Sequence, residues 1–162
     1  MSKGTTVLSG VILCIAIAAG VGLYFRVADD RPGVQEARDI VEEAVRYCKE
    51  AGPEKLIEEI NAHKERWVRG ALYVFAYKKE PRGLMVAHGA NPELVNKNLY
   101  DLTDPTGKLF VKAYLDIAIL SGESEVPFLW PNPVTKEVEK KVGVCKLTED
   151  KQYVICSGSY SK

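Results

Sequence analysis

The sequence predicts an α+β fold in which helices pack on an antiparallel sheet of about five strands. Two observations carry this prediction. Over residues 34–60 apolar side chains recur at three- and four-residue steps, the spacing typical of amphipathic helices. From residue 71 onward they alternate, or run in short stretches bounded by Gly, Pro, Asn and Asp, which is typical of strands and turns. A chain of 162 residues is long enough for one such domain.

Two helices are expected before the sheet. Asp30 can cap the first helix, with Pro32 in its first turn, and the apolar stripe continues to Lys49. Gly52-Pro53 ends this helix and begins the second. The stripe of the second helix comprises Leu56, Ile57, Ile60 and Trp67. Stripes of this kind are best explained by packing against a sheet.

The first predicted strand, residues 71–77, is apolar or aromatic on both faces, so we expect it inside the sheet and covered on both sides. The remaining elements, in order, are a turn at 80–83, a return strand at 84–88, a long connection at 91–106, a helix that follows Gly107 and ends at Ser121-Gly122, a strand at 125–130 and a hairpin of 137–147 and 152–160. We expect the helices on one side of these strands.

The connection over residues 91–106 is long for a compact domain. Such loops are usually either functional or disordered. This one carries apolar residues that can pack, namely Leu94, Val95, Leu99, Tyr100 and Leu102. We therefore interpret it as a lid over a site.

The segment from residue 5 to residue 25 carries no charge, and a helix of that length rises about 31 Å, enough to cross a membrane. Ala16-Ile17-Ala18 leaves a cleaved signal peptide as the alternative, which would make the protein secreted. We favour an uncleaved transmembrane anchor over 5–25, because the apolar run continues to Phe25. Lys3 on one side and Asp29-Asp30 on the other place the domain of residues 30–162 outside the cytoplasm, on a single-pass protein of the cell membrane.

Composition excludes several function classes. Lys plus Arg and Asp plus Glu both number 22, which gives no support for nucleic-acid binding. The chain has two histidines and no Cys/His cluster, so a metal site is not expected. No Gly-x-Ser-x-Gly, phosphate-loop or dinucleotide motif occurs. We expect neither an enzyme nor a cofactor.

Cys145 and Cys156 fall on the two strands of the final hairpin. Pairing Leu147 with Val154 places the two cysteines opposite each other, close enough for a disulfide. Two buried thiols are the alternative.

A pocket is suggested by Tyr73, Phe75 and Tyr77, which share one strand face. Lys141 shares a face with Gly143 and could neutralise a small carboxylate there, an interaction that strengthens away from water. The alternative is a solvated lysine in a charged run. The residues that could converge on the aromatic face are His88, Tyr100, Trp130 and Lys141.

Together these patterns resemble the single-Cache family of extracytoplasmic sensor domains, over about Pro32 to Tyr160. The motifs that carry the resemblance are Tyr73-Val-Phe75, Ala87-His88, Asn91 to Val95 followed by Lys97-Asn98-Leu99, Asp104 to Gly107, Trp130 to Thr135, and Lys141.

The resemblance implies a long N-terminal helix, a PAS-like antiparallel sheet, and a pocket over that sheet for small organic molecules, often short carboxylates. By it, Tyr73 and Phe75 line the pocket floor. His88, Trp130 and Lys141 supply polar and aromatic contacts, and the loop around Asn98 and Tyr100 closes the pocket.

The leading hypothesis is therefore a membrane-anchored extracytoplasmic domain that binds a short organic acid without covalent chemistry, with a lid that closes over Lys141. The chain ends at Lys162 with no output domain, so we expect a separate signalling partner, a homo-oligomer, or coupling through the N-terminal helix. The alternative is a pilin-like surface or filament protein that assembles through its apolar N-terminal helix.

Overall fold

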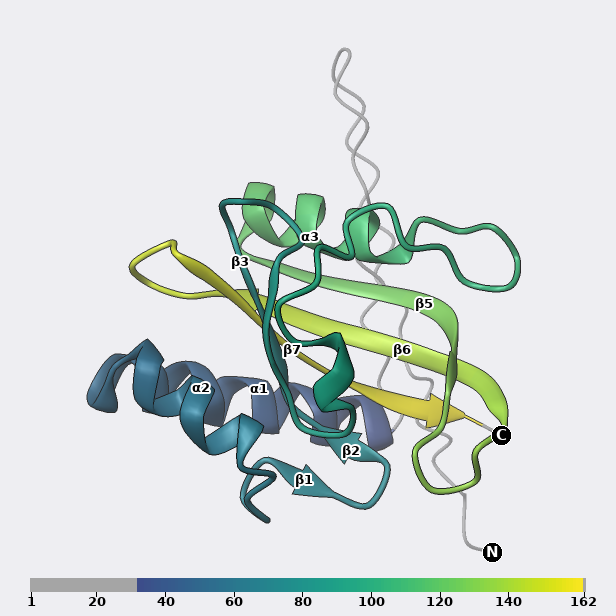
Figure 1. The fold of residues 1–162 in the computed structure, drawn as a ribbon, viewed down its shortest axis with the longest axis horizontal. Helices are drawn as coiled ribbons and strands as arrows, with labels where there is room; N and C mark the ends of the chain where they lie inside the picture. Colours follow the sequence, from purple (N-terminus) through teal and green to yellow (C-terminus); the bar gives the residue numbers. More distant parts are fainter. Residues whose placement is uncertain (1–31, 162) are drawn as a thin grey trace, which may run out of the picture.

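The computed structural model describes residues 32–161, and they form a five-stranded antiparallel sheet covered on both faces (Figure 1). The strands are β3 (Phe75–Lys78), β4 (Met85–His88), β5 (Glu123–Pro131), β6 (Val138–Leu147) and β7 (Tyr153–Ser161), in the spatial order β4-β3-β7-β6-β5. The α+β class and the antiparallel sheet are thus confirmed. The anchor expected over residues 5–25 lies outside the described residues, and none of the helices within 32–161 is long and apolar enough to cross a membrane.

The helices lie on both faces of the sheet, so the expectation of helices on one side was wrong (Figure 1). Helix α1 (Pro32–Ala51) and helix α2 (Pro53–Asn61) pack on one face, against Val74, Ala76 and Ile155. Helix α3 (Phe110–Ser121) packs on the other face, against Tyr73, Phe75 and Tyr77. The physical reason is that β3 and the residues before it are apolar on both sides, and both sides have to be removed from water.

Helix α2 is shorter than the apolar stripe suggested. It ends at Asn61, and Trp67 lies beyond it, so the prediction that Trp67 belongs to this helix was wrong. Trp67 is nevertheless fully buried, and its Nε1 donates to Glu59 Oε2 at 3.0 Å. A buried aromatic at helical spacing was thus mistaken for a continuation of the helix.

The predicted strand at 71–77 is divided. A short strand β2 (Leu72–Tyr73) pairs with β1 (Val68–Arg69), and β3 begins only at Phe75. Val74 lies between them, where its N–H donates to Trp67 O at 2.9 Å. The chain therefore leaves one sheet and joins the other without changing which side chains face α3.

The final hairpin has the register expected from the sequence. Leu147 pairs with Val154 and Cys145 with Cys156. The two cysteines form a disulfide, with Sγ atoms 2.08 Å apart, and both are fully buried.

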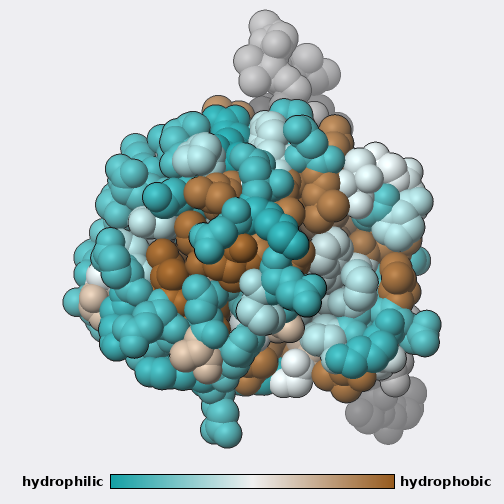
Figure 2. Space-filling view, viewed as in Figure 1, coloured by the Kyte–Doolittle hydropathy of each residue, from teal (hydrophilic) through white to brown (hydrophobic). Residues whose placement is uncertain are grey.

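The connection between β4 and α3 crosses the α3 side of the sheet, and residues 91–108 of it are called the strap below. It contains one short 3₁₀ helix, η1 (Pro92–Leu94). In the view of Figure 1 the strap runs over the front of the sheet, and Figure 2 shows apolar surface gathered near the middle of that face between hydrophilic side chains. The strap and α3 together roof the aromatic face of the sheet.

Candidate ligand-binding site

A small cavity lies between the sheet, α3 and the strap. Its volume is ≈ 20 Å³, room for about one water molecule. Apolar and aromatic walls with a few polar groups are the usual make-up of a small-molecule site. The lining residues are Tyr73, Phe75, Tyr77, Met85, His88, Leu94, Leu99, Leu102, Phe110, Tyr114, Phe128, Trp130 and Lys141.

Five of the seven ligand-binding residues expected from the sequence line this cavity: Tyr73, Phe75, His88, Trp130 and Lys141. Asn98 and Tyr100 are not among its lining residues. They lie on the outer side of the strap, in the polar cluster described below.

Sequence reasoning missed the residues that α3 contributes to the cavity, and it missed Phe128 of β5. Phe110 and Tyr114 are one helical turn apart and reach the cavity from α3. Phe128 lies two residues before Trp130 on β5 and stacks on Phe110 with ring centroids 4.3 Å apart. The sequence could have indicated Phe128, because residues two apart on a strand share a face and Trp130 was already a candidate.

Lys141 is the central polar residue of the site, and it is only 1% exposed. Its Nζ lies 3.8 Å from the ring centroid of Tyr73 and 4.7 Å from that of Tyr160. Burial without water lowers the pKa of this ammonium well below its usual value. None of the described residues that line the cavity is acidic, so no carboxylate of the lining offsets that cost.

Two glycines leave space for side chains of the site, Gly158 for Lys141 and Gly143 for Phe128. Gly143 and Gly158 face each other across β6 and β7. A Cβ added to Gly158 would lie 2.5 Å from Lys141 Cε, and one added to Gly143 would lie 2.9 Å from Phe128 Cε1. The absence of a side chain at Gly158 lets Lys141 run across the sheet with its ammonium pointing into the aromatic cluster.

His88 is held as a neutral ring. Its Nδ1 accepts hydrogen bonds from the backbone N–H groups of Ala90, at 3.2 Å, and Asn91, at 2.8 Å, so we assign the ring proton to Nε2. The ring stacks on Phe75 at 5.6 Å. Burial, with a smaller contribution from the charge of Lys141, lowers the pKa of His88 to about 3. The Nε2–H is the donor that this ring can present to the cavity.

A chain of phenols closes the end of the site near β5 and β6. The Tyr160 hydroxyl donates to Pro131 O at 2.9 Å, so its oxygen is left to accept from the Tyr73 hydroxyl at 3.2 Å. Burial raises the pKa of Tyr73 to about 12, so this phenol remains a donor at physiological pH.

The strap is fastened at both edges of the sheet. At the β4 edge, the N–H of Asn96 donates to Met85 O at 2.9 Å and the N–H of Met85 donates to Lys97 O at 3.0 Å. At the β5 edge, Asp104 Oδ2 accepts from the N–H of Leu129 at 3.1 Å. Between these points the strap turns three leucines toward the cavity: Leu94, Leu99 and Leu102.

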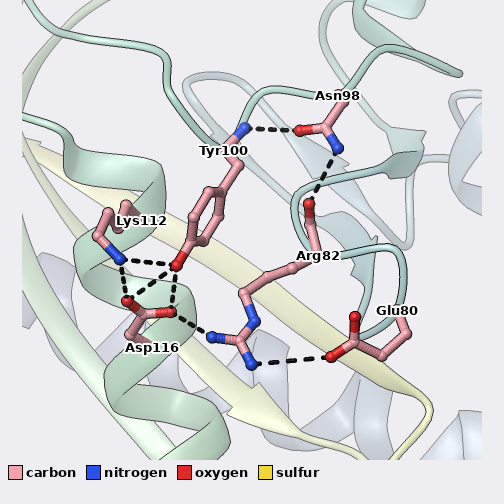
Figure 3. Close-up of polar contacts among 6 residues, drawn as sticks. All are labelled: Glu80, Arg82, Asn98, Tyr100, Lys112 and Asp116. Atoms are coloured by element: carbon pink, nitrogen blue, oxygen red, sulfur yellow. Dashed lines mark hydrogen bonds and ion pairs between the residues drawn. The ribbon is translucent and has the colours of Figure 1, made fainter.

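The outer side of the strap is held by a polar cluster around Asp116 of α3 (Figure 3). The Tyr100 hydroxyl donates to Asp116 Oδ1 at 2.8 Å. Lys112 Nζ lies 2.7 Å from Asp116 Oδ2, and Arg82 NH1 donates to Oδ1 at 2.9 Å. Asn98 Nδ2 donates to Arg82 O at 3.0 Å, so Asn98 and Tyr100 hold the strap to α3 and to the turn before β4.

A family model described as the Cache domain (dCache_2) matches residues 33–162, nearly all of the described fold. The chain belongs to the Cache domain family. Cache domains are sensory ligand-binding domains, so this Cache domain is a sensory ligand-binding domain and not an enzyme.

Solved structures that share the fold include three from chemosensory proteins. A methyl-accepting chemotaxis protein from Vibrio parahaemolyticus RIMD 2210633 has a TM-score of 0.65 and 24% identity, over 78% of this chain and 86% of that one. A periplasmic sensor domain of a chemotaxis protein has a TM-score of 0.61 and 26% identity, over 80% and 90%. A Cache chemosensory domain, solved to explain its recognition of carboxylic acids, has a TM-score of 0.61 and 22% identity, over 80% and 88%.

Proposed function

We propose that this Cache domain is an extracytoplasmic sensor for a short monocarboxylic acid, anchored in the membrane by residues 5–25. The observation that carries the proposal is the buried ammonium of Lys141 in a cavity whose described lining has no acidic residue. A buried charge is costly unless it is paired, and an anionic ligand supplies the missing partner. The recognition of carboxylic acids by a Cache domain of the same fold supports this choice of ligand.

The geometry divides the site into two parts. Lys141 and the Nε2–H of His88 are the donors for the carboxylate, since both lie over Tyr73 and Phe75. The apolar remainder of the acid would pack against Phe110, Phe128 and the leucines of the strap. A bound carboxylate also stabilises the charged form of Lys141, because opposite charges in a site shielded from water attract strongly.

A cavity of ≈ 20 Å³ is too small for a two- to four-carbon acid. Binding therefore requires the roof of the site to move. The strap can move without breaking the sheet. Its polar cluster around Asp116 is solvent-accessible, whereas the strands beneath it are buried. We infer that the strap opens to admit the ligand and closes over Lys141, by selection among conformations that the protein already samples.

The proposal is tested with the full chain purified in detergent. Its thermal stability is measured with acetate, propionate, butyrate and pyruvate, and affinity by isothermal titration calorimetry. A ligand at 100 times its Kd should stabilise the fold by about 2.7 kcal/mol. Lys141→Met should weaken binding roughly 30-fold or more, because a buried anion then has no cation beside it.

Lys140→Met is the matched control, because Lys140 is exposed on the same strand and should bind like the wild type. Absence of stabilisation by every acid in the series would contradict the proposal. So would unchanged affinity in Lys141→Met.

A further inference from the structure

The ammonium of Lys141 lies in an aromatic cage. Three rings surround Nζ, those of Tyr73 at 3.8 Å, Tyr160 at 4.7 Å and Phe75 at 5.3 Å. Rings whose faces surround a cation within about 6 Å form the kind of site that recognises ammonium ligands. Here the rings come from β2, β7 and β3, and the cation is the protein's own. The sheet thus holds a preformed cation subsite that is already filled.

We propose that Lys141, by filling this cage with its own ammonium, makes the cavity selective for acids without an amino group and excludes amino acids and amines. The proposal rests on the proposed function, because it names the class of carboxylate that the same site accepts. Lys141 is then a specificity-determining residue as well as a partner for the anion.

An amino acid would bring a second cation into the cavity. Its carboxylate would lie beside Lys141, and its α-ammonium, two bonds away, would lie close to a second cation. The described lining residues include no aspartate or glutamate that could accept that ammonium. Asp104 of the strap already accepts from the N–H of Leu129, and Asp116 is held on the outside by Lys112 and Arg82.

If the Lys141 side chain is truncated, a free amine could take the place of its ammonium in the cage. The Lys141 side chain crosses Gly158, where an added Cβ would lie 2.5 Å from Lys141 Cε. Truncation of Lys141 therefore leaves a channel along the sheet that ends at the three rings. A small alkylammonium ion such as ethylammonium has the size and charge to fill that space.

Two arms of one experiment test this on the full chain. In the first arm, isothermal titration calorimetry compares propionate with alanine, which differ only by the amino group. The wild type should bind propionate and bind alanine roughly 100-fold more weakly, since like charges held close together are strongly disfavoured. Alanine affinity within threefold of propionate would overturn the proposal.

In the second arm, thermal shift compares ethylammonium chloride with sodium chloride at equal ionic strength. Lys141→Ala should be stabilised by ethylammonium and the wild type should not. The effect should be lost in Lys141→Ala combined with Tyr160→Leu, which removes one ring of the cage. Equal response of the wild type and Lys141→Ala would overturn the proposal.

The two arms separate this inference from the proposed function. Failure of the wild type to bind any carboxylate sinks the proposed function, while the ethylammonium arm still decides whether the cage is a cation subsite. If Lys141→Ala does not fold, Lys141→Met fills the channel with a neutral chain. In the Lys141→Met variant, the ratio of propionate affinity to alanine affinity should be at least tenfold smaller than in the wild type. An unchanged ratio would contradict the role of Lys141.

Discussion

At the scale of single residues, the site depends on two basic groups that the fold keeps from water. Lys141 reaches its position because Gly158 leaves space for its methylenes, and aromatic faces partly replace its lost hydration. His88 is fixed as a hydrogen-bond donor because two backbone N–H groups occupy its other nitrogen. Both groups have pKa values below their usual range because burial disfavours the charged form.

The neutral state of His88 predicts an acid-sensitive fold. The folded residue takes up a proton only near pH 3, whereas the unfolded residue does so near its ordinary pKa of 6.5. Between those values the unfolded state binds more protons, so the contribution of His88 to stability is present above pH 6.5 and is lost as the pH falls. The loss at pH 5 should be about 2 kcal/mol.

Urea denaturation at pH 5 and pH 7.5 checks this prediction. The difference in unfolding free energy between the two pH values should be about 2 kcal/mol smaller in His88→Gln than in the wild type. When the pH-dependent change in unfolding free energy is compared between the two proteins, the contributions of groups that titrate alike in both cancel. An equal difference in the two proteins would show that folding does not lower the pKa of His88.

At the scale of elements, the strap is held firmly at its ends and more weakly in its middle. Backbone bonds to Met85 hold it on the β4 side, and Asp104 holds it on the β5 side through the N–H of Leu129. The middle is held by one backbone bond, from the N–H of Leu99 to Gly83 O, and by the Tyr100 hydroxyl on Asp116 in a partly exposed ion cluster. Exposed ion pairs contribute little free energy, so the middle is where the strap should open first.

Tyr100→Phe is expected to increase opening of the strap without disturbing the sheet. Loss of the hydroxyl removes the hydrogen bond that it donates to Asp116 and the one that it accepts from Lys112. Both are partly exposed and together are worth about 1 kcal/mol, so the amides beneath should exchange with solvent roughly fivefold faster. Native-state hydrogen exchange of the Leu99 N–H, which donates to Gly83 O at 2.9 Å, reports this opening. The Ala44 N–H in α1 should be unchanged. Unaltered exchange at Leu99 would mean that the Tyr100 contact does not hold the strap.

The elements also show what the sequence could and could not predict. Alternation fixes which side chains share a strand face, so the register of Cys145 with Cys156 and the grouping of Tyr73 with Phe75 were predictable. When both faces of a strand are apolar, alternation does not say which face a helix covers. The position of α3 was therefore not predictable from the sequence. The strap has no regular period, and the direction of Tyr100 is set by Asp116, a residue 16 positions away.

At the scale of the whole molecule, one sheet separates the candidate site from α1. On β6, Lys141 faces the cavity, whereas Val142 and Val144 pack against Val34 and Ala37 of α1. Arg38 of α1 also pairs with Glu125 of β5 through two contacts of 2.7 and 3.0 Å. A shift of β6 at the site therefore moves the residues that support α1. The sheet is therefore in contact with the candidate site on one face and with α1 on the other.

The sheet is cross-linked by the disulfide between β6 and β7. Cys145 and Cys156 are 11 residues apart, and closing a loop of that length stabilises the fold by about 3 kcal/mol, mainly by restricting the unfolded chain. Both sulfurs are buried, so reduction requires unfolding first. We expect urea denaturation with dithiothreitol to give an unfolding free energy lower by about 3 kcal/mol. The Cys145→Ala, Cys156→Ala double variant should be insensitive to the reductant, and equal sensitivity in both proteins would locate the effect at another cysteine.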